Sequence, residues 1–290
     1  MYKIIGAAPQ REILISLSAF YLLVPWQLAS AHGDWEEQID AITAKIRKEP
    51  TNAVFYLRRG ELHRLHTEAA EALADYAEAA RLKPDSVMPA LYRAQLFSDI
   101  GRTKEAIAEA NSVLQREPLL PEALLIRARC HVKLAAIQEA VPDLSAALGK
   151  WTAPQPELYL ERAQLQAAMG RLDDAVKGLE VGMSKIGETP TLQMAAIEYE
   201  RQQAKFDAAL ARVEKITQKY SVKESWLLLR GEILAQAGRA AEARVAFKAV
   251  LADLEKYPPA RRNLDQTKQL ETRALDALAH AEAKLVRASR

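Results

Sequence analysis

The sequence repeats itself at an almost constant interval over most of its length. The repeated segments begin 34 residues apart, except that one interval is 35 residues. A unit this short cannot bury its own apolar face, so neighbouring units must stack to form a shared core. The periodicity therefore predicts a linear array rather than one or two globular domains. The first residues of the six segments are Ala53, Val87, Pro121, Pro156, Pro190 and Glu224.

Small residues recur at two fixed positions of each segment. Position 20 is alanine in all six segments, and position 8 is glycine or alanine in five of them. Position 24 mostly carries a larger side chain, and position 15 is small or polar, as a chain reversal requires. This pattern predicts two antiparallel helices per segment, helix A and helix B, that approach closely at the small residues. The position-20 alanines are Ala72, Ala106, Ala140, Ala175, Ala209 and Ala243.

The first segment, residues 53–84, resembles a known family, the tetratricopeptide repeats, which have two antiparallel helices in 34 residues. The resemblance extends over residues 53–257 and is weakest in the fifth segment, where Ile197 replaces a small residue and Ala204 replaces the turn glycine. It implies an all-α fold, a right-handed α-solenoid that acts by binding proteins. The residues at signature positions are Tyr56, Gly60, His63, Ala72, Tyr76 and Pro84.

Residues 1–31 have the layout of a secretory signal peptide. Lys3 and Arg11 precede the apolar run Ile13–Val24, and Ala29-Ser30-Ala31 forms a small-residue cleavage site. Cleavage after Ala31 predicts a periplasmic or secreted protein with no membrane span. The alternative is that the leader is kept as an uncleaved anchor.

The remaining segments are predicted to cap the array. Residues 32–52 form one helix, with a capping box at Asp34 and Glu37. Residues 258–290 form a closing helical segment, with Leu270, Leu275 and Leu278 facing inward. Such caps cover the apolar ends that an array of repeats otherwise exposes.

Composition excludes several classes of protein. The formal net charge of +2 argues against a nucleic-acid partner, because binding phosphates needs a concentrated positive surface. Cys130 is the only cysteine, so no intramolecular disulfide can form. Stability must therefore come from packing.

Arginine recurs at position 7 of helix A in every segment except the fifth, which has Ala196. In the first three segments an acidic residue stands sixteen residues later, and antiparallel helices would bring the two together. We interpret these arginines as partners in ion pairs within a repeat rather than as an anion-binding ladder. Arg162 and Arg230 lack such a partner and are the candidates for another role. The predicted pairs are Arg59 with Asp75, Arg93 with Glu109, and Arg127 with Asp143.

The resemblance also implies a binding site. In this family, helix A side chains line a concave groove that holds extended peptides or helices. Carried over, position 5 forms an apolar stripe and position 9 a polar edge, although a leucine at position 5 can instead pack between neighbouring A helices. The predicted groove residues are Leu57, Glu61, Arg64, Leu91, Gln95, Leu125, Arg129, Leu160, Gln164, Met194, Glu198, Leu228 and Glu232.

Motifs for catalysis are missing: the sequence has no glycine-rich phosphate loop, nucleophile elbow or zinc-protease motif. We therefore expect a scaffold without enzymatic activity, cofactor or metal, whose partner is a protein or peptide. The alternative is a copper-handling protein, in which His32, as the new N-terminus, chelates copper together with His63 or His66.

Overall fold

The computed structural model describes residues 31–152, 154–219 and 223–288. The predicted leader, apart from Ala31, lies outside these residues. Within them every regular element is a helix, so the predicted all-α fold is confirmed. None of these helices is long and apolar enough to cross a membrane.

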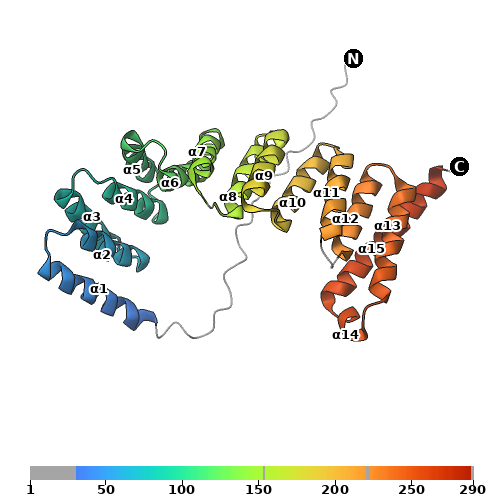
Figure 1. The fold of residues 1–290 in the computed structure, drawn as a ribbon, viewed down its shortest axis with the longest axis horizontal. Coiled ribbons are helices and arrows are strands. Elements are labelled where there is room, and N and C mark those ends of the chain that lie inside the picture. The colour runs from blue at the N-terminus through green and yellow to red at the C-terminus, as the bar shows by residue number, and fades with distance from the viewer. Residues whose placement is uncertain (1–30, 153, 220–222, 289–290) are drawn as a thin grey trace, which may run out of the picture. The chain divides into compact units, whose positions relative to one another are not determined.

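Two helices form each repeat, and they alternate along the chain (Figure 1). The A helices are α2 (Ala53–Leu65), α4 (Met88–Asp99), α6 (Pro121–Lys133), α8 (Pro156–Ala168), α10 (Pro190–Gln202) and α12 (Glu224–Gln236). The B helices are α3 (Ala69–Leu82), α5 (Thr103–Arg116), α7 (Ile137–Lys150), α9 (Leu172–Ile186), α11 (Phe206–Lys219) and α13 (Ala240–Glu255). The flanking helices are α1 (Ala31–Lys48), α14 (Pro259–Arg262) and α15 (Asp265–Ala288).

The chain divides into two compact units between Pro89 and Ala90. In the first unit, α2 packs on both α1 and α3. In the second unit, α5, α7, α9 and α11 each pack against the A helix that follows, and α13 packs against α15. This unit is therefore a solenoid, in which each B helix is shared between two neighbouring A helices.

Close contact between helices A and B explains the small residues. The alanines at position 20 are fully buried. A Cβ atom at Gly60 would lie 2.5 Å from Cε1 of Tyr76, and one at Gly231 would clash with the ring of Phe247. In these two repeats, position 8 must therefore be glycine because an aromatic ring fills position 24.

The turn at position 15 has the same backbone conformation in all six repeats. Gly101, Gly170 and Gly238 adopt φ values of 78°, 75° and 77°. The other three repeats adopt the left-handed region without glycine, with φ between 56° and 64°. The repeat geometry thus overrides the local preference for glycine, at a cost of about 1–2 kcal/mol per residue. The three non-glycine residues are Thr67, Ala135 and Ala204.

Two predictions for the ends of the chain are wrong. Helix α1 begins at Ala31, so Asp34 lies inside its first turn and is not the N-cap residue. Leu275 on α15 is 51% exposed, because the face that α15 turns towards α13 is built around Ala274 and Ala281. Leu270 and Leu278 do pack against this cluster.

Candidate functional site on the A helices

We define the A-helix face as the side chains at positions 2, 5, 9, 12 and 13 of the A helices. Position 5 of this face is not equally accessible along the second unit. Met194 on α10 is 44% exposed, whereas Leu125 on α6 and Leu160 on α8 are half-buried. Leu91 and Leu228 are buried, with 6% and 1% of their surfaces exposed. The accessible apolar stripe of the second unit therefore runs over three repeats only, those of α6, α8 and α10.

The burial of Leu228 corrects its predicted place in the groove. Leu228 belongs to the core cluster that also contains Leu254 of α13 and Ala274 of α15. The closing helix thus contributes to the core around Leu228. Leu91 is also buried, which is the alternative expected for a leucine at position 5 that packs between helices. In the first unit, Leu57 is half-buried.

Position 9 is polar in every repeat, and most of its side chains are held by neighbours. Glu61 pairs with Arg64 at 3.1 Å and also accepts a hydrogen bond from the hydroxyl of Tyr76. Gln95 donates to Asp99 at 2.7 Å, and Glu198 pairs with Arg201 at 3.1 Å. Arg129 pairs with Glu161, Glu232 pairs with Arg273, and Gln164 is exposed.

Polar contacts link most neighbouring helices along this face of the second unit. Lys133 on α6 donates to the backbone oxygen of Ser98 at 2.7 Å, and Arg129 on α6 pairs with Glu161 on α8 at 3.3 Å. Arg201 on α10 donates to Gln236 on α12 at 2.9 Å.

Arg273 on α15 pairs with Glu232 on α12 at 2.7 Å. Among the described residues, no comparable side-chain contact joins α8 to α10, although these helices pack directly on each other. Leu160 and Met194 lie at this junction. On the A-helix face, the junction of α8 and α10 thus combines accessible apolar side chains with the fewest polar contacts among the described residues.

The arginines at position 7 meet the acidic residues in the first three repeats. Arg59 donates two hydrogen bonds to Asp75, at 2.8 and 2.7 Å, and a third to Thr43 on α1. Arg127 donates to both oxygens of Asp143 at 2.7 and 2.6 Å and, like Arg59, reaches a side chain of the preceding helix. Hydrogen bonds to the buried carboxylates raise the pKa of both guanidinium groups.

The second repeat has the same geometry, but its carboxylate is more exposed to solvent. Arg93 donates to Glu109 at 2.9 and 2.8 Å, and about a quarter of each side chain is exposed. These arginines are neutralised within their own repeats, so they do not form an anion-binding ladder.

Arg162, in the fourth repeat, has no carboxylate partner among the described residues. Its Nη2 donates to the backbone oxygen of Gly178 at 3.0 Å, and its guanidinium lies 5.7 Å from the ring centre of Tyr159. Its Nε atom is buried, and no residue in the part of the chain that the structure describes forms a hydrogen bond with it. Burial lowers the pKa of Arg162, in contrast to Arg59 and Arg127. Arg230, in the sixth repeat, forms no ion pair among the described residues, although Glu242 is near enough to feel its charge.

The fifth repeat contains an ion pair that the sequence reasoning missed. Arg212 on α11 lies between Glu200 on α10, at 2.7 Å, and Glu180 on α9, at 2.5 Å. Arg212 stands at position 23 of helix B, where the first three repeats have their acid, and its acid Glu200 stands at position 11 of helix A, one helical turn beyond Ala196. In the sequence, the change in this polar contact is indicated by alanine in place of arginine at residue 196 and by an arginine sixteen residues later.

A second regularity also went unnoticed. Position 16 is basic in four repeats, and it links a turn to neighbouring acidic residues. Arg239 pairs with Asp207 of the preceding repeat at 3.1 Å, and Lys205 pairs with Asp173 in the same register. These exposed pairs lie at the start of the B helices, away from the A-helix face.

The histidines proposed for copper are engaged in other contacts. Nδ1 of His63 lies 2.6 Å from Glu68, and its Nε2 lies 3.9 Å from Asp75. The ring of His66 meets the ring of Trp35 edge-on at 5.0 Å. The side chain of His32 lies outside the described residues, and within these no group of three or more suitable ligands is placed to hold a metal ion.

Comparison with known proteins identifies the repeat. The tetratricopeptide repeat-like domain family matches residues 135–279, and a tetratricopeptide repeat family matches residues 91–150. The chain belongs to the tetratricopeptide-repeat proteins, as its sequence pattern predicts. Proteins built from these repeats generally act as non-catalytic scaffolds for other proteins. No curated protein sequence matches the chain.

Solved structures agree on the fold. One similar structure is the C-terminal part of a tetratricopeptide repeat-containing protein from Cytophaga hutchinsonii, at 15% identity and a TM-score of 0.59. The match covers 86% of this chain and 96% of that one. Another is PilW, a type IV pilus biogenesis factor, at 18% identity and a TM-score of 0.50, covering 68% of this chain and 91% of that one. At these identities the similarity shows the fold alone.

Proposed function

We propose that the protein is a non-catalytic scaffold that holds a partner peptide or helix on the A-helix face of α6, α8 and α10. The exposure of Met194 carries this proposal. Met194 is the most exposed member of the stripe that it forms with Leu125 and Leu160, and it lies on α10, next to α8, where the described residues show no polar side-chain link between the two A helices. Flexible thioether side chains at an accessible apolar surface suit the capture of another protein's side chains.

The polar edge of this stripe supports the same function. Gln164 is exposed and free to hydrogen-bond to a partner's backbone, and Glu198 is half-exposed beside Arg201. An apolar centre with a polar rim is the usual composition of a protein interface. Because the leader has the features of a signal peptide, we place this scaffold in the periplasm or cell envelope.

The test uses a photo-crosslinking residue at Met194, introduced into the full chain in cells. The matched control is Val245 on α13, which is also an exposed aliphatic side chain, at 63%, but lies on a B helix. We expect a discrete crosslinked partner from position 194 and none from position 245. The partner is then purified and titrated against the Met194→Asp and Val245→Asp variants.

Met194→Asp should weaken binding at least about tenfold, since a buried apolar contact of this size contributes about 1.5–3 kcal/mol. Val245→Asp should leave the affinity unchanged. Equal crosslinking from both positions, or an affinity that does not respond to Met194→Asp, would rule out binding on this face.

A further inference from the structure

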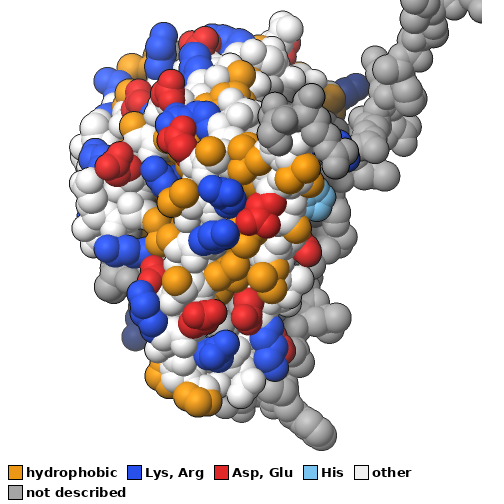
Figure 2. Space-filling view, turned by 90° about the vertical axis from the view of Figure 1, so that its right-hand side faces the viewer, with side chains coloured by type: hydrophobic (Ala, Val, Ile, Leu, Met, Phe, Trp, Pro, Cys, Tyr) orange, Lys and Arg blue, Asp and Glu red, His pale blue; other side chains and the backbone are white. Residues whose placement is uncertain are grey.

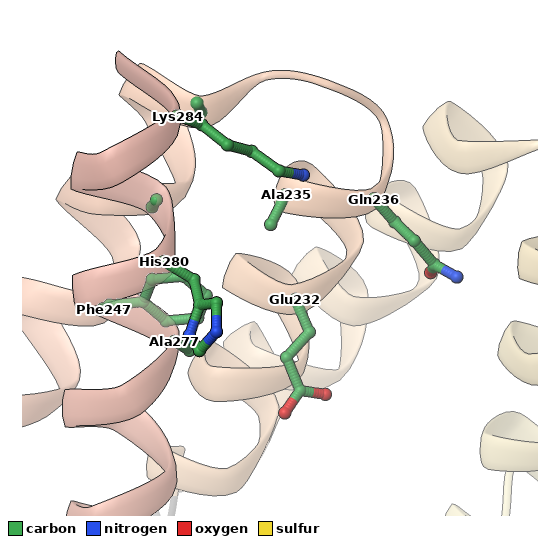
Figure 3. Close-up of a pocket in the computed structure, with 9 residues that line it drawn as sticks. Glu232, Ala235, Gln236, Phe247, Ala277, His280 and Lys284 are labelled. Carbon is green, nitrogen blue, oxygen red and sulfur yellow. The ribbon is translucent and has the colours of Figure 1, made fainter. Parts of the chain in front are cut away.

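The A-helix face of the second unit ends in a pocket against α15. The pocket has a volume of about 280 Å³ and lies between α12, the start of α13 and α15. Its apolar wall is made of small residues and one ring, and polar side chains stand around it (Figure 3). The apolar residues are Ala235, Ala240, Phe247, Ala277 and Ala281, and the polar ones are Glu232, Gln236, His280 and Lys284.

Small side chains create this space. Ala235 faces α15 from position 12 of α12, and Ala277 and Ala281 face it from successive turns of α15. Ligand pockets usually measure roughly 300–1,000 Å³, so this one lies at the small end and suits a single aliphatic side chain. Phe247 is fully buried and closes the base of the space.

The charges around the pocket are not balanced. Glu232 is neutralised by Arg273 at 2.7 Å, and Gln236 is turned towards α10, where it accepts a hydrogen bond from Arg201. Lys284 extends from α15 across the mouth of the pocket towards Ala235 (Figure 3). Among the described residues no carboxylate pairs with Lys284. The rim therefore carries one uncompensated positive charge beside an apolar floor.

The outer surface near this end does not have the same character. Figure 2 shows the side of the molecule that α15 occupies in Figure 1, where basic and acidic side chains are interspersed with apolar ones. Lys248 on α13, for example, pairs with Glu282 on α15 at 3.3 Å. The unpaired Lys284 is thus a local feature of the pocket and not part of a broadly basic surface.

We propose that this pocket binds an acidic segment of a partner protein by taking in one aliphatic side chain, while Lys284 pairs with an adjacent carboxylate. The proposal rests on the proposed function, because the pocket continues the A-helix face through Glu232, Ala235 and Gln236. It adds the chemistry of the partner: a leucine-sized side chain next to aspartate or glutamate. Small apolar residues give the shape, and the unpaired ammonium gives the charge preference.

The test uses three short peptides with blocked ends. They are acetyl-Gly-Asp-Leu-Asp-Gly-amide, a copy with lysine in place of both aspartates, and a copy with serine in place of leucine. The full chain is labelled with ¹³C at alanine methyl groups, and each peptide is titrated while the signals of Ala235, Ala277 and Ala281 are followed. Only the first peptide should shift these signals saturably.

Three variants locate the interaction. Lys284→Glu should weaken binding of the acidic peptide at least about tenfold, because it replaces an attraction by a repulsion at the rim. Ala277→Leu should do the same by filling the pocket. Lys268→Glu makes the same charge change on an exposed part of α15 far from the pocket and should leave binding unchanged. Thermal unfolding checks that all three variants fold.

Other results would overturn the proposal. Equal binding of the acidic and basic peptides, no shift with any peptide, or binding that survives both Lys284→Glu and Ala277→Leu would each exclude the pocket. Failure here leaves the proposed function intact if the Met194 variants still lose their partner. Conversely, peptide binding in the pocket does not rescue the proposed function if Met194→Asp leaves partner affinity unchanged.

Discussion

The first three repeats and the next two differ in the polar contact between helices A and B. In repeats one to three, an arginine on helix A meets a carboxylate on helix B, as Arg127 meets Asp143. In repeat four the arginine is kept, but Gly178 replaces its acid, and in repeat five Arg212 on helix B meets Glu200 on helix A. The backbone follows the same repeat in all five cases, so this polar contact does not determine the fold.

Repeats four and five contain buried polar atoms without hydrogen-bond partners among the described residues, which lowers the stability of this region. The buried side-chain atoms that lack a hydrogen-bond partner among the described residues all lie between residues 159 and 203. Each such atom costs about 1–3 kcal/mol of desolvation. We therefore expect repeats four and five to be the least stable part of the second unit. The atoms are Tyr159 Oη, Arg162 Nε, Gln166 Oε1, Gln193 Oε1, Glu200 Oε2 and Gln203 Oε1.

The largest effect should come from breaking a complete pair. Asp143→Ala leaves the guanidinium of Arg127 partly buried, with Asn111 as its remaining side-chain partner among the described residues, and we expect a loss of about 3 kcal/mol of unfolding free energy. Glu109→Ala removes the acid at the same position of the second repeat, where the carboxylate is more exposed than that of Asp143, and should cost about 1 kcal/mol. Urea unfolding followed by circular dichroism measures both. Equal losses would show that burial does not set the strength of these pairs.

A smaller effect, of opposite sign, should come from completing the pair in repeat four. Gly178→Asp offers Arg162 a carboxylate and removes a glycine from the middle of α9, which together should stabilise the chain by about 1–2 kcal/mol. A new Cβ would lie 2.6 Å from Nη2 of Arg162, but this is the far end of a flexible side chain that can move.

Gly178→Ala is the matched control for this substitution, because it removes the glycine without adding a carboxylate. Alanine is the better helix former inside α9, so the ion pair must outweigh this difference, and we expect Gly178→Asp to unfold at a higher urea concentration than Gly178→Ala. If Gly178→Ala is as stable as Gly178→Asp, a carboxylate at residue 178 does not stabilise repeat four.

Sequence reasoning succeeded where the repeat itself fixes the geometry. Alanine at position 20 and small residues at position 8 mark the contact between helices A and B, and that contact sets which residues face each other. Arg59 and Asp75 could be paired for this reason, because sixteen residues span one helical hairpin. The pair of Arg212 with Glu200 was not open to the same reasoning, because the two residues are twelve positions apart and residue 196, sixteen positions before Arg212, is alanine.

Sequence reasoning failed where a residue depends on a segment outside the repeat. Leu228 has the same position as Leu125 and Leu160, yet it is buried in a cluster to which α15 contributes. The buried face of α15 is built around Ala274 and Ala281, with Leu270 and Leu278 packed beside them, whereas Leu275, which was predicted on the same face, is exposed. The start of α1 likewise lies before the residue that resembles an N-cap. The repeat pattern contains no information about how these flanking helices dock.

The smallest effect concerns the inverted pair of repeat five and is seen through pH. Burial raises the pKa of Glu200, and Arg212 only partly opposes the rise; Glu180 adds to it and Lys205 lowers it. The folded state therefore binds this proton more tightly than the unfolded state, for which the pKa of glutamate is about 4.3. As pH falls from neutrality through the folded pKa, the contribution of Glu200 to stability rises, and it is lost again as pH increases.

Glu200→Gln removes this titration while keeping the shape of the side chain. The unfolding free energy of the variant, minus that of the parent chain, should thus be greatest near neutral pH and decrease as the pH is lowered towards about 5. A difference for Glu200→Gln that grows as the pH falls would mean that Arg212 outweighs burial. The inverted pair would then be electrostatically equivalent to the pairs of the first three repeats.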